Sequence, residues 1–364
     1  MSVITPDLIT LETPGTLRRA KLWMPKRVVF TPSALAEPWG QRIYQRVSGL
    51  GLPVEELSAN RLTGLRGDDV RDTYRRAKST LAVVTAPPSA MRLQPIPPSA
   101  DWQFHIAEGC PAHCQYCYLA GSLSGPPVVR VFANLPAILE NNARYAPDDG
   151  PVQTFEASCY TDPLGIEHLT GGLAECIRWF GQTEKAYLRW VSKFDAVDSL
   201  LDLPHNGHTR CRASVNASSV SRRYEGGVAS VSDRLASLRK LALPVSQGGG
   251  GYPVGIVIAP IMPIPDWQAH YMKLLADIET ALNFSCDLTF ELITHRFTPG
   301  SRDTLLDWYP NTTLDLDPAN RDVKRNKFGG EKYVYPKAAM KELRTFFETE
   351  IARRFPTARV LYFT

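Results

Sequence analysis

Residues 104–117 read FHIAEGCPAHCQYC, a strand-like run that leads directly into Cys110, Cys114 and Cys117. Three thiolates on one tight loop can bind three corners of a cubane iron–sulfur cluster, for which cysteine is the usual ligand. The fourth iron of such a cluster is left open to another molecule. The spacing therefore favours an iron–sulfur site, and it places that site at the end of a strand.

Two other interpretations of the cysteine spacing stay open at this point. A zinc ion could take the three thiolates with His105 or His113 as a fourth ligand, although structural zinc more often uses paired C-x2-C knuckles. The cysteines could also be buried without a metal, although three on one polar loop would be unusual. If the metal is zinc, the corresponding functional hypothesis is a zinc-stabilised protein that binds nucleic acid without catalysis.

Outward from the motif, strand-like and helix-like runs alternate. The predicted strands are residues 104–109, 152–158, 187–193, 210–216, 255–260 and 288–293, and the helices between them include residues 134–145, 169–180, 231–241 and 266–282. Such alternation indicates parallel βαβ units. Six units are too few for a closed eight-stranded barrel, so we predict an α/β fold with a partial, open (β/α)6 TIM-like barrel. In such barrels the chemistry sits at the carboxyl ends of the strands.

Smaller parts are expected on both sides of this barrel. Before it we predict a small N-terminal α/β unit with strands at 27–31 and 79–85, a helix at 39–50 and a Pro-rich linker at 87–98. After it we predict a β-hairpin within 323–336, a helix at 337–354 and a final strand at 359–363. The predicted division of the chain is residues 1–98, 99–298 and 299–364.

The composition limits the class of protein. Of 364 residues, 44% are hydrophobic and 21% charged, which excludes a mostly disordered, collagen-like or coiled-coil chain. The net charge of +4 allows a polyanionic partner without demanding one. The seven cysteines are an odd number and are few for a chain of this length, which argues against a secreted disulfide framework. No apolar run suits a signal peptide or approaches the roughly 20 residues that span a bilayer, so we predict a cytoplasmic protein without a membrane partner.

The motif CPAHCQYC resembles that of the radical S-adenosylmethionine (radical SAM) superfamily. The resemblance extends to the spore photoproduct lyase family through AKSTL at 77–81, HCQYCYL at 113–119, FEASCYTDPLGIEHLTG at 155–171, KFDAVDSLLDLPHNGHTR at 193–210, VIAPI at 257–261, TFELITHRFT at 289–298 and the terminal YFT. It implies a 4Fe–4S cluster held by Cys110, Cys114 and Cys117, with S-adenosylmethionine on the unique iron. It also implies a DNA-repair lyase that reverts 5-thyminyl-5,6-dihydrothymine to two thymines through a 5′-deoxyadenosyl radical.

The same resemblance implies roles for single residues. Cys159 would donate a hydrogen atom to the thymine radical, and Tyr116 and Tyr118 would relay a hydrogen atom back to the cofactor. The implied contacts to S-adenosylmethionine are Tyr118, Thr161, Lys193, Ser214 and Ala259. The implied contacts to DNA are His295, Arg296, Lys324, Arg325, Lys327, Lys332 and Tyr333.

The family also implies a monomer, a DNA partner that carries a thymine lesion, and an electron donor such as flavodoxin or ferredoxin. The chain departs from the family pattern at the tip of the hairpin and at Tyr160, where smaller residues are more usual. These departures favour, as an alternative, a related radical SAM enzyme that acts on another DNA lesion or another substrate.

Overall fold

The computed structural model describes residues 10–11, 18–20, 22–123, 125–325 and 330–364. The strands are β1 (Thr10–Leu11), β2 (Arg18–Arg19), β3 (Arg27–Phe30), β4 (Val54–Glu56), β5 (Thr80–Val84), β6 (Gln94–Ile96), β7 (Ala100–Phe104), β8 (Ala107–Glu108), β9 (Val129–Phe132), β10 (Gln153–Ala157), β11 (Ala186–Ser192), β12 (Thr209–Val215), β13 (Val254–Ile261), β14 (Leu288–Thr294), β15 (Asp322–Arg325), β16 (Glu331–Val334) and β17 (Arg359–Phe363).

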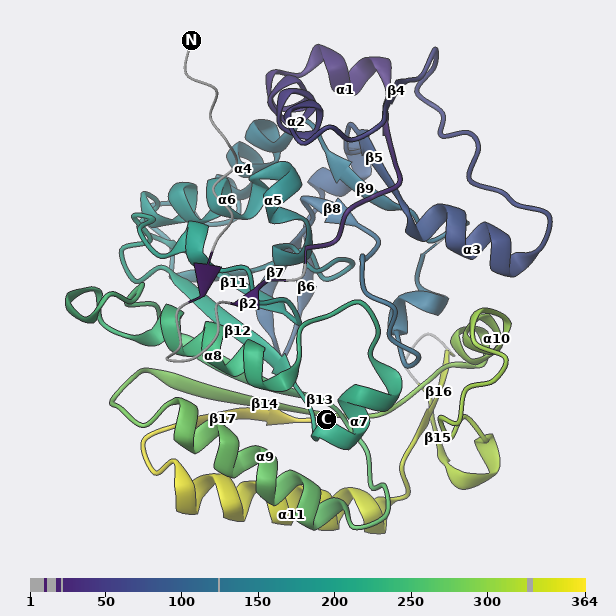
Figure 1. Ribbon diagram of the computed structural model, residues 1–364. Helices are drawn as coiled ribbons and strands as arrows, with labels where there is room; N and C mark the ends of the chain where they lie inside the picture. Colours follow the sequence, from purple (N-terminus) through teal and green to yellow (C-terminus); the bar gives the residue numbers. More distant parts are fainter. Residues whose placement is uncertain (1–9, 12–17, 21, 124, 326–329) are drawn as a thin grey trace.

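The larger sheet is an open, mostly parallel sheet of eight strands in the order β17-β14-β13-β12-β11-β10-β7-β6 (Figure 1). Its strands alternate with helices, so the predicted partial barrel is confirmed. The barrel strands from β10 to β14 lie within one residue of their predicted bounds, and most of their residues are buried.

Three local predictions differ from the structure. The first barrel strand, β7, ends at Phe104, whereas the sequence favoured a strand that begins there. The terminal strand β17 is not a separate extension, because it pairs in parallel with β14 and adds a seventh parallel strand to the barrel sheet. The Pro-rich segment contains the edge strand β6, which pairs antiparallel with β7. Pro95 is tolerated there because an edge strand leaves part of its backbone unpaired.

A second sheet of five strands has the order β4-β3-β5-β9-β8. Its strand β9 comes from the middle of the chain and pairs in parallel with β5, next to the short antiparallel strand β8. Strands β7 and β8 are therefore close neighbours in the sequence but belong to different sheets. The loop that carries the three cysteines begins directly after β8, so it starts where the chain has just crossed between the two sheets.

The α-helices are α1 (Pro32–Ala36), α2 (Pro38–Gly49), α3 (Val70–Lys78), α4 (Leu135–Ala143), α5 (Glu167–Thr170), α6 (Gly172–Gly181), α7 (Ser218–Tyr224), α8 (Val231–Ala242), α9 (Trp267–Ala281), α10 (Pro299–Trp308) and α11 (Lys337–Arg354). Helices α9 and α11 lie side by side against β14 and β17 at the bottom of Figure 1. None of the helices in the described part of the chain is long and apolar enough to cross a membrane.

Charged side chains occupy part of the barrel interior. Arg212 on β12 forms ion pairs with Glu156 on β10 and with Glu291 on β14, the latter at 2.8 Å. Arg189 on β11 also pairs with Glu291, and the Tyr362 hydroxyl on β17 donates to Glu291 at 2.5 Å. Buried charges are tolerated only when they are paired and hydrogen-bonded. This barrel ion cluster, Glu156, Arg189, Arg212, Glu291 and Tyr362, therefore joins strands from across the sheet.

Candidate active site

The cysteine loop, residues 109–117, is held by neighbours on several sides. Gly109 has a φ of +77°, and a Cβ there would lie 2.1 Å from the carbonyl oxygen of Val128, so the turn into the loop requires glycine. The Lys78 ammonium donates to the carbonyl oxygens of Cys110 and Ala112. These contacts fix the backbone between the first two cysteines.

The three thiols of this loop suit an iron–sulfur cluster. None of the described cysteines is in a disulfide. Burial raises the pKa of the Cys110 thiol to about 12, and Asp162 and Cys117 add to the rise, so Lys78 is the neighbouring charge that favours the thiolate form needed by a cluster. No three Cys, His, Asp or Glu side chains among the described residues converge as ligands of a single metal ion. A cubane cluster binds each thiolate through a different iron, so its ligands do not need to converge.

Cys159 lies just beyond the carboxyl end of β10, beside the cysteine loop. The preceding residue, Ser158, has a φ of +56°, which turns the chain sharply at the strand end. The hydroxyl of Tyr118 donates to the carbonyl oxygen of Cys159. Burial, and then the charge of Glu156, raises the pKa of the Cys159 thiol. Cys159 is therefore held as a protonated thiol, and its S–H hydrogen is available for transfer.

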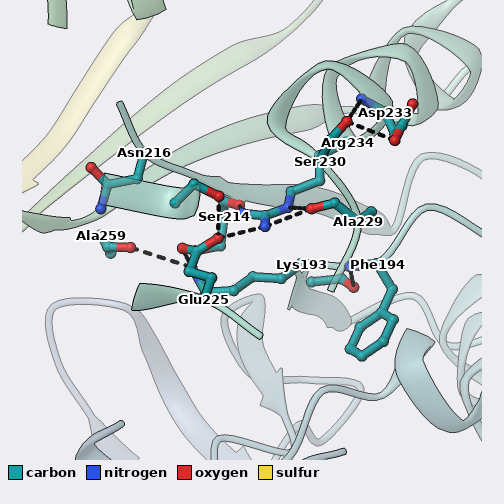
Figure 2. A network of polar contacts seen from close by, with 12 residues as sticks. Lys193, Phe194, Ser214, Asn216, Glu225, Ala229, Ser230, Asp233, Arg234 and Ala259 are labelled. Carbon is teal, nitrogen blue, oxygen red and sulfur yellow. Dashed lines mark hydrogen bonds and ion pairs between the residues drawn. The ribbon is translucent and has the colours of Figure 1, made fainter. Parts of the chain in front are cut away.

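The side-chain amine of Lys193 contacts two other predicted cofactor residues, Ser214 and Ala259 (Figure 2). The Lys193 Nζ donates to Ser214 Oγ at 2.9 Å and to the carbonyl oxygen of Ala259 at 3.4 Å. These residues come from the carboxyl ends of β11, β12 and β13, which parallel pairing brings to one edge of the sheet.

The Lys193 amine also contacts Glu225, which sequence reasoning missed. Glu225 accepts from Lys193 at 2.9 Å and from Arg234 at 2.5 Å (Figure 2). It also accepts from the Tyr116 hydroxyl. Burial raises the pKa of Glu225, but Lys193 and Arg234 outweigh burial and hold it well below its usual range. A glutamate in a short Gly-containing loop gave no sequence signal for this role. Tyr116 thus lies on the Lys193 side of the site, whereas Tyr118 lies beside Cys159.

Thr161 offers a polar atom to a ligand. Its buried hydroxyl has no hydrogen-bond partner among the described residues, a costly arrangement unless a ligand or water satisfies it. The next residue, Asp162, accepts from the Lys193 backbone N–H and from Ser192 Oγ, both at 2.7 Å. The Asp162 carboxylate therefore ties the segment of Thr161 to the end of β11. An orphaned hydroxyl on a segment tied to the end of β11 offers a hydrogen-bonding group to a polar molecule such as S-adenosylmethionine.

The predicted DNA residues divide into exposed and buried groups. Strands β15 and β16 form the predicted hairpin, and Tyr333 bridges to Phe297 next to Arg296. Arg296, Lys324, Arg325 and Lys332 are exposed. His295 is only 2% exposed, which does not suit a direct phosphate contact. Lys327 lies outside the described residues.

The base of the hairpin is held by Arg321, a residue that the sequence did not single out. The guanidinium of Arg321 lies 3.8 Å from the centre of the Tyr335 ring and donates to the carbonyl oxygen of Asp315 at 3.0 Å. It also lies 3.4 Å from His295 Nδ1. His295 therefore packs beneath the hairpin with Arg321.

Cations gather on the outside of the hairpin. Lys324 lies directly opposite Lys332 across the two strands. Partial burial, followed by the charges of Arg296 and Lys324, lowers the pKa of Lys332. Like charges that face each other across a strand pair are destabilising. A bound polyanion removes that repulsion, so this cation group, Arg296, Lys324 and Lys332, suits phosphates.

Comparisons with known proteins agree on one family. The family model described as spore photoproduct lyase matches residues 23–364. The chain is 39% identical over 348 residues to the spore photoproduct lyase of Geobacillus sp. (strain Y412MC61), covering 94% of this chain and 100% of that protein. It is 36% identical over 346 residues to the spore photoproduct lyase of Bacillus subtilis (strain 168), covering 94% and 99%. A solved structure of a spore photoproduct lyase mutant with bound AdoMet and dinucleoside spore photoproduct aligns with a TM-score of 0.88 at 38% identity, covering 94% of this chain and 100% of that chain.

Proposed function

The chain belongs to the spore photoproduct lyase family, and on that premise we propose how its own residues carry out the repair reaction. It is an enzyme, a radical SAM lyase that reverts the spore photoproduct in DNA to two thymines. Its cofactors are a 4Fe–4S cluster and S-adenosylmethionine. The single observation that carries the residue assignment is the hydrogen bond from Tyr118, next to the third cysteine of the loop, to Cys159.

The cofactors have sites on both sides of this contact. Cys110, Cys114 and Cys117 bind the cluster. Bound together, the cluster and S-adenosylmethionine supply the 5′-deoxyadenosyl radical that removes a hydrogen atom from the lesion. The amine, hydroxyl and carbonyl groups that bind S-adenosylmethionine come from Tyr118, Thr161, Lys193, Ser214 and Ala259. Lys193 is the natural partner for a ligand carboxylate, because Glu225 and Ser214 already hold its amine in place.

Cys159 supplies the hydrogen atom that completes the second thymine. Its S–H bond breaks as the new C–H bond forms, which leaves a sulfur radical on Cys159. The hydroxyl of Tyr118 lies against the backbone of Cys159, and its O–H hydrogen restores the thiol. Tyr118 is then one hydrogen atom short, and Tyr116, whose hydroxyl bonds to Glu225 beside Lys193, would pass a hydrogen atom to it from the cofactor side, so that the radical returns to the cofactor.

The DNA contacts lie on the C-terminal hairpin and, in the case of Arg296, directly beside it. Arg296, Lys324, Arg325 and Lys332 bind phosphates, as does Lys327, and Tyr333 stacks near the lesion. His295 supports the hairpin from beneath. We propose that residues 99–298 perform the radical chemistry, that residues 299–364 hold the DNA, and that residues 1–98 support the cysteine loop through Lys78.

The partners and the compartment follow from the same chemistry. A one-electron donor such as flavodoxin or ferredoxin reduces the cluster. The enzyme acts as a monomer in the reducing cytoplasm, which keeps its thiols available as ligands and as a hydrogen donor.

An anaerobic assay tests the residue assignment. The reconstituted enzyme, with dithionite and a dinucleotide spore photoproduct, is expected to release thymine. Cys159→Ala should still cleave S-adenosylmethionine but should lose thymine release by about 10²-fold or more. The matched control Cys286→Ala alters a half-buried cysteine outside the site and should behave like the wild type. Cofactor cleavage without thymine from the wild-type enzyme would instead favour a different substrate.

A further inference from the structure

One side of the cysteine loop carries side chains that the reaction above does not use. His113 and Gln115 alternate with the cysteines and are half-buried. The Tyr74 hydroxyl on α3 lies 2.9 Å from His113 Nδ1, and the Tyr74 ring packs 4.9 Å from that of Trp308 at the end of α10. A continuous series of contacts therefore runs from Trp308, which is partly exposed, to the backbone of Cys114.

Exposed arginines lie on α3 and α7, the two helices that contact this side of the cysteine loop. Arg71 and Arg75 lie one turn apart on α3, and 75% of the Arg75 side chain is exposed. Arg222 and Arg223 lie on the last turn of α7. Gln115 of the cysteine loop donates to the carbonyl oxygen of Arg223 at 3.3 Å, so this helix end directly borders the loop.

This surface mixes arginines with carboxylates, since Asp68 and Asp69 are exposed directly before Val70. Asp72 is shared between two arginines of α3, and Asp307 is exposed on α10. Val70, at the start of α3, is 52% exposed. Arginine together with exposed apolar and aromatic groups is typical of protein interfaces. We name this surface the loop face: Val70, Arg71, Arg75, Gln115, Arg222 and Trp308.

We propose that the loop face is the docking surface for an acidic, low-potential electron-carrier protein. This inference rests on the proposed function, because a radical SAM enzyme needs its cluster reduced. The reduced carrier loses one electron and the cluster gains it, and no atom moves between the two proteins. The rate of electron transfer through protein falls steeply with distance, so the carrier has to dock where the cluster-binding loop meets the surface. The arginines favour an acidic partner through charge complementarity.

The hairpin cations form a separate surface better suited to DNA. Lys324, Lys332 and Arg296 face one another there, and phosphates are bound mainly by such charge. Both surfaces expose a valine, Val323 at 53% on the hairpin and Val70 at 52% on the loop face, so the feature that distinguishes the loop face is that it borders the cysteine loop through Gln115.

Stopped-flow electron transfer to the holoenzyme tests the proposal. Flavodoxin hydroquinone serves as the probe, and its oxidation is followed anaerobically at several ionic strengths. The double variant Arg71→Glu/Arg75→Glu and the separate variant Arg222→Glu reverse charge on the two sides of the loop. Lys273→Glu reverses an equally exposed charge on α9, where 71% of the side chain is accessible, and serves as the control. Thermal unfolding verifies that each variant is folded.

At low salt, the second-order rate constant is expected to fall about 10-fold or more in the loop-face variants and to stay near wild type in Lys273→Glu. The difference should shrink as salt screens the charges. Dithionite-driven thymine release should not change, since a small reductant needs no docking surface. Unchanged flavodoxin kinetics in both loop-face variants would overturn the proposal, as would a loss confined to affinity for lesion DNA. Failure of thymine release in the wild type would instead count against the proposed function and leave the docking result intact.

Discussion

Glu225 shows how one buried carboxylate can organise a site. It neutralises both Lys193 and Arg234, and its side chain is fully buried between them. Without its charge, two cations would face each other in the interior, where repulsion is poorly screened. The lysine that would meet the cofactor therefore depends on a residue that need not touch the cofactor.

Glu225→Gln should lower the free energy of unfolding by about 3–5 kcal/mol, because it leaves two buried charges without their counter-ion. Urea unfolding at neutral pH measures the loss. Glu279→Gln is the matched control, since the Glu279 side chain is 49% exposed in its pair with Arg354, and it should cost less than about 1 kcal/mol. Equal losses in the two variants would contradict the role given to Glu225.

His295 predicts a pH dependence of stability. Burial, and then the charge of Arg321, lowers its pKa from 6.5 to about 3. The unfolded chain therefore binds a proton at higher pH than the folded chain does. The stability contributed by neutral His295 is complete above pH 6.5 and is lost as the pH falls toward 3.

His295→Asn removes this titration. As the pH falls from 7 to 5, the free energy of unfolding of the variant should therefore decrease by about 2 kcal/mol less than that of the wild type. Urea unfolding at the two pH values gives the comparison, and other titrating groups cancel between the two proteins. Parallel pH profiles for wild type and variant would show that His295 does not titrate as its burial requires.

At the scale of elements, the β15–β16 hairpin places like charges opposite each other. Lys324→Ala and Lys332→Ala should each weaken binding of a lesion-containing oligonucleotide and reduce the salt dependence of affinity by about one unit of slope. Fluorescence anisotropy at several salt concentrations measures both effects. Stability should not fall, because each substitution removes repulsion within the hairpin. Lys273→Ala on α9 should leave the affinity and its salt dependence unchanged. A similar loss of affinity in that control would contradict the assignment of Lys324 and Lys332 as phosphate contacts.

The cysteine loop is an element built by its surroundings. Lys78 of α3 donates to its backbone, and the His113 N–H donates to the carbonyl oxygen of Gly226 at 2.7 Å. Its ligands therefore sit on a segment fixed by residues from distant parts of the chain. A fixed loop is what a cluster with three thiolate ligands needs, since its geometry is set before the cluster binds.

At the scale of the whole molecule, the barrel ion cluster connects the last strand to the rest of the sheet. Tyr362→Phe deletes the hydroxyl that donates to Glu291 and should lower the free energy of unfolding by about 1–3 kcal/mol. Leu361→Ala, a 39% exposed neighbour on the same strand, should have a smaller effect. Chemical denaturation measures both, and an equal or smaller loss in Tyr362→Phe would indicate that the hydroxyl adds nothing to the cluster.

Each of the two sheets positions a different part of the site. One holds the barrel strands whose ends carry Cys159, Lys193, Ser214 and Ala259, and the other holds β8, from which the cysteine loop departs. The Tyr118 hydroxyl, which follows the cysteine loop, connects the two parts by donating to the carbonyl oxygen of Cys159.

The sequence by itself determined the barrel strands, the cysteine loop and the family, because these depend on local periodicity and on residues close together in the chain. It also placed Lys193, Ser214 and Ala259 at strand ends, where parallel pairing then brought them together. Only the tertiary structure decided that Glu225 holds both Lys193 and Arg234, that His295 is buried, and that β17 completes the barrel sheet. Each of these depends on contacts between residues far apart in the sequence, and no local pattern records how a buried charge finds its partner.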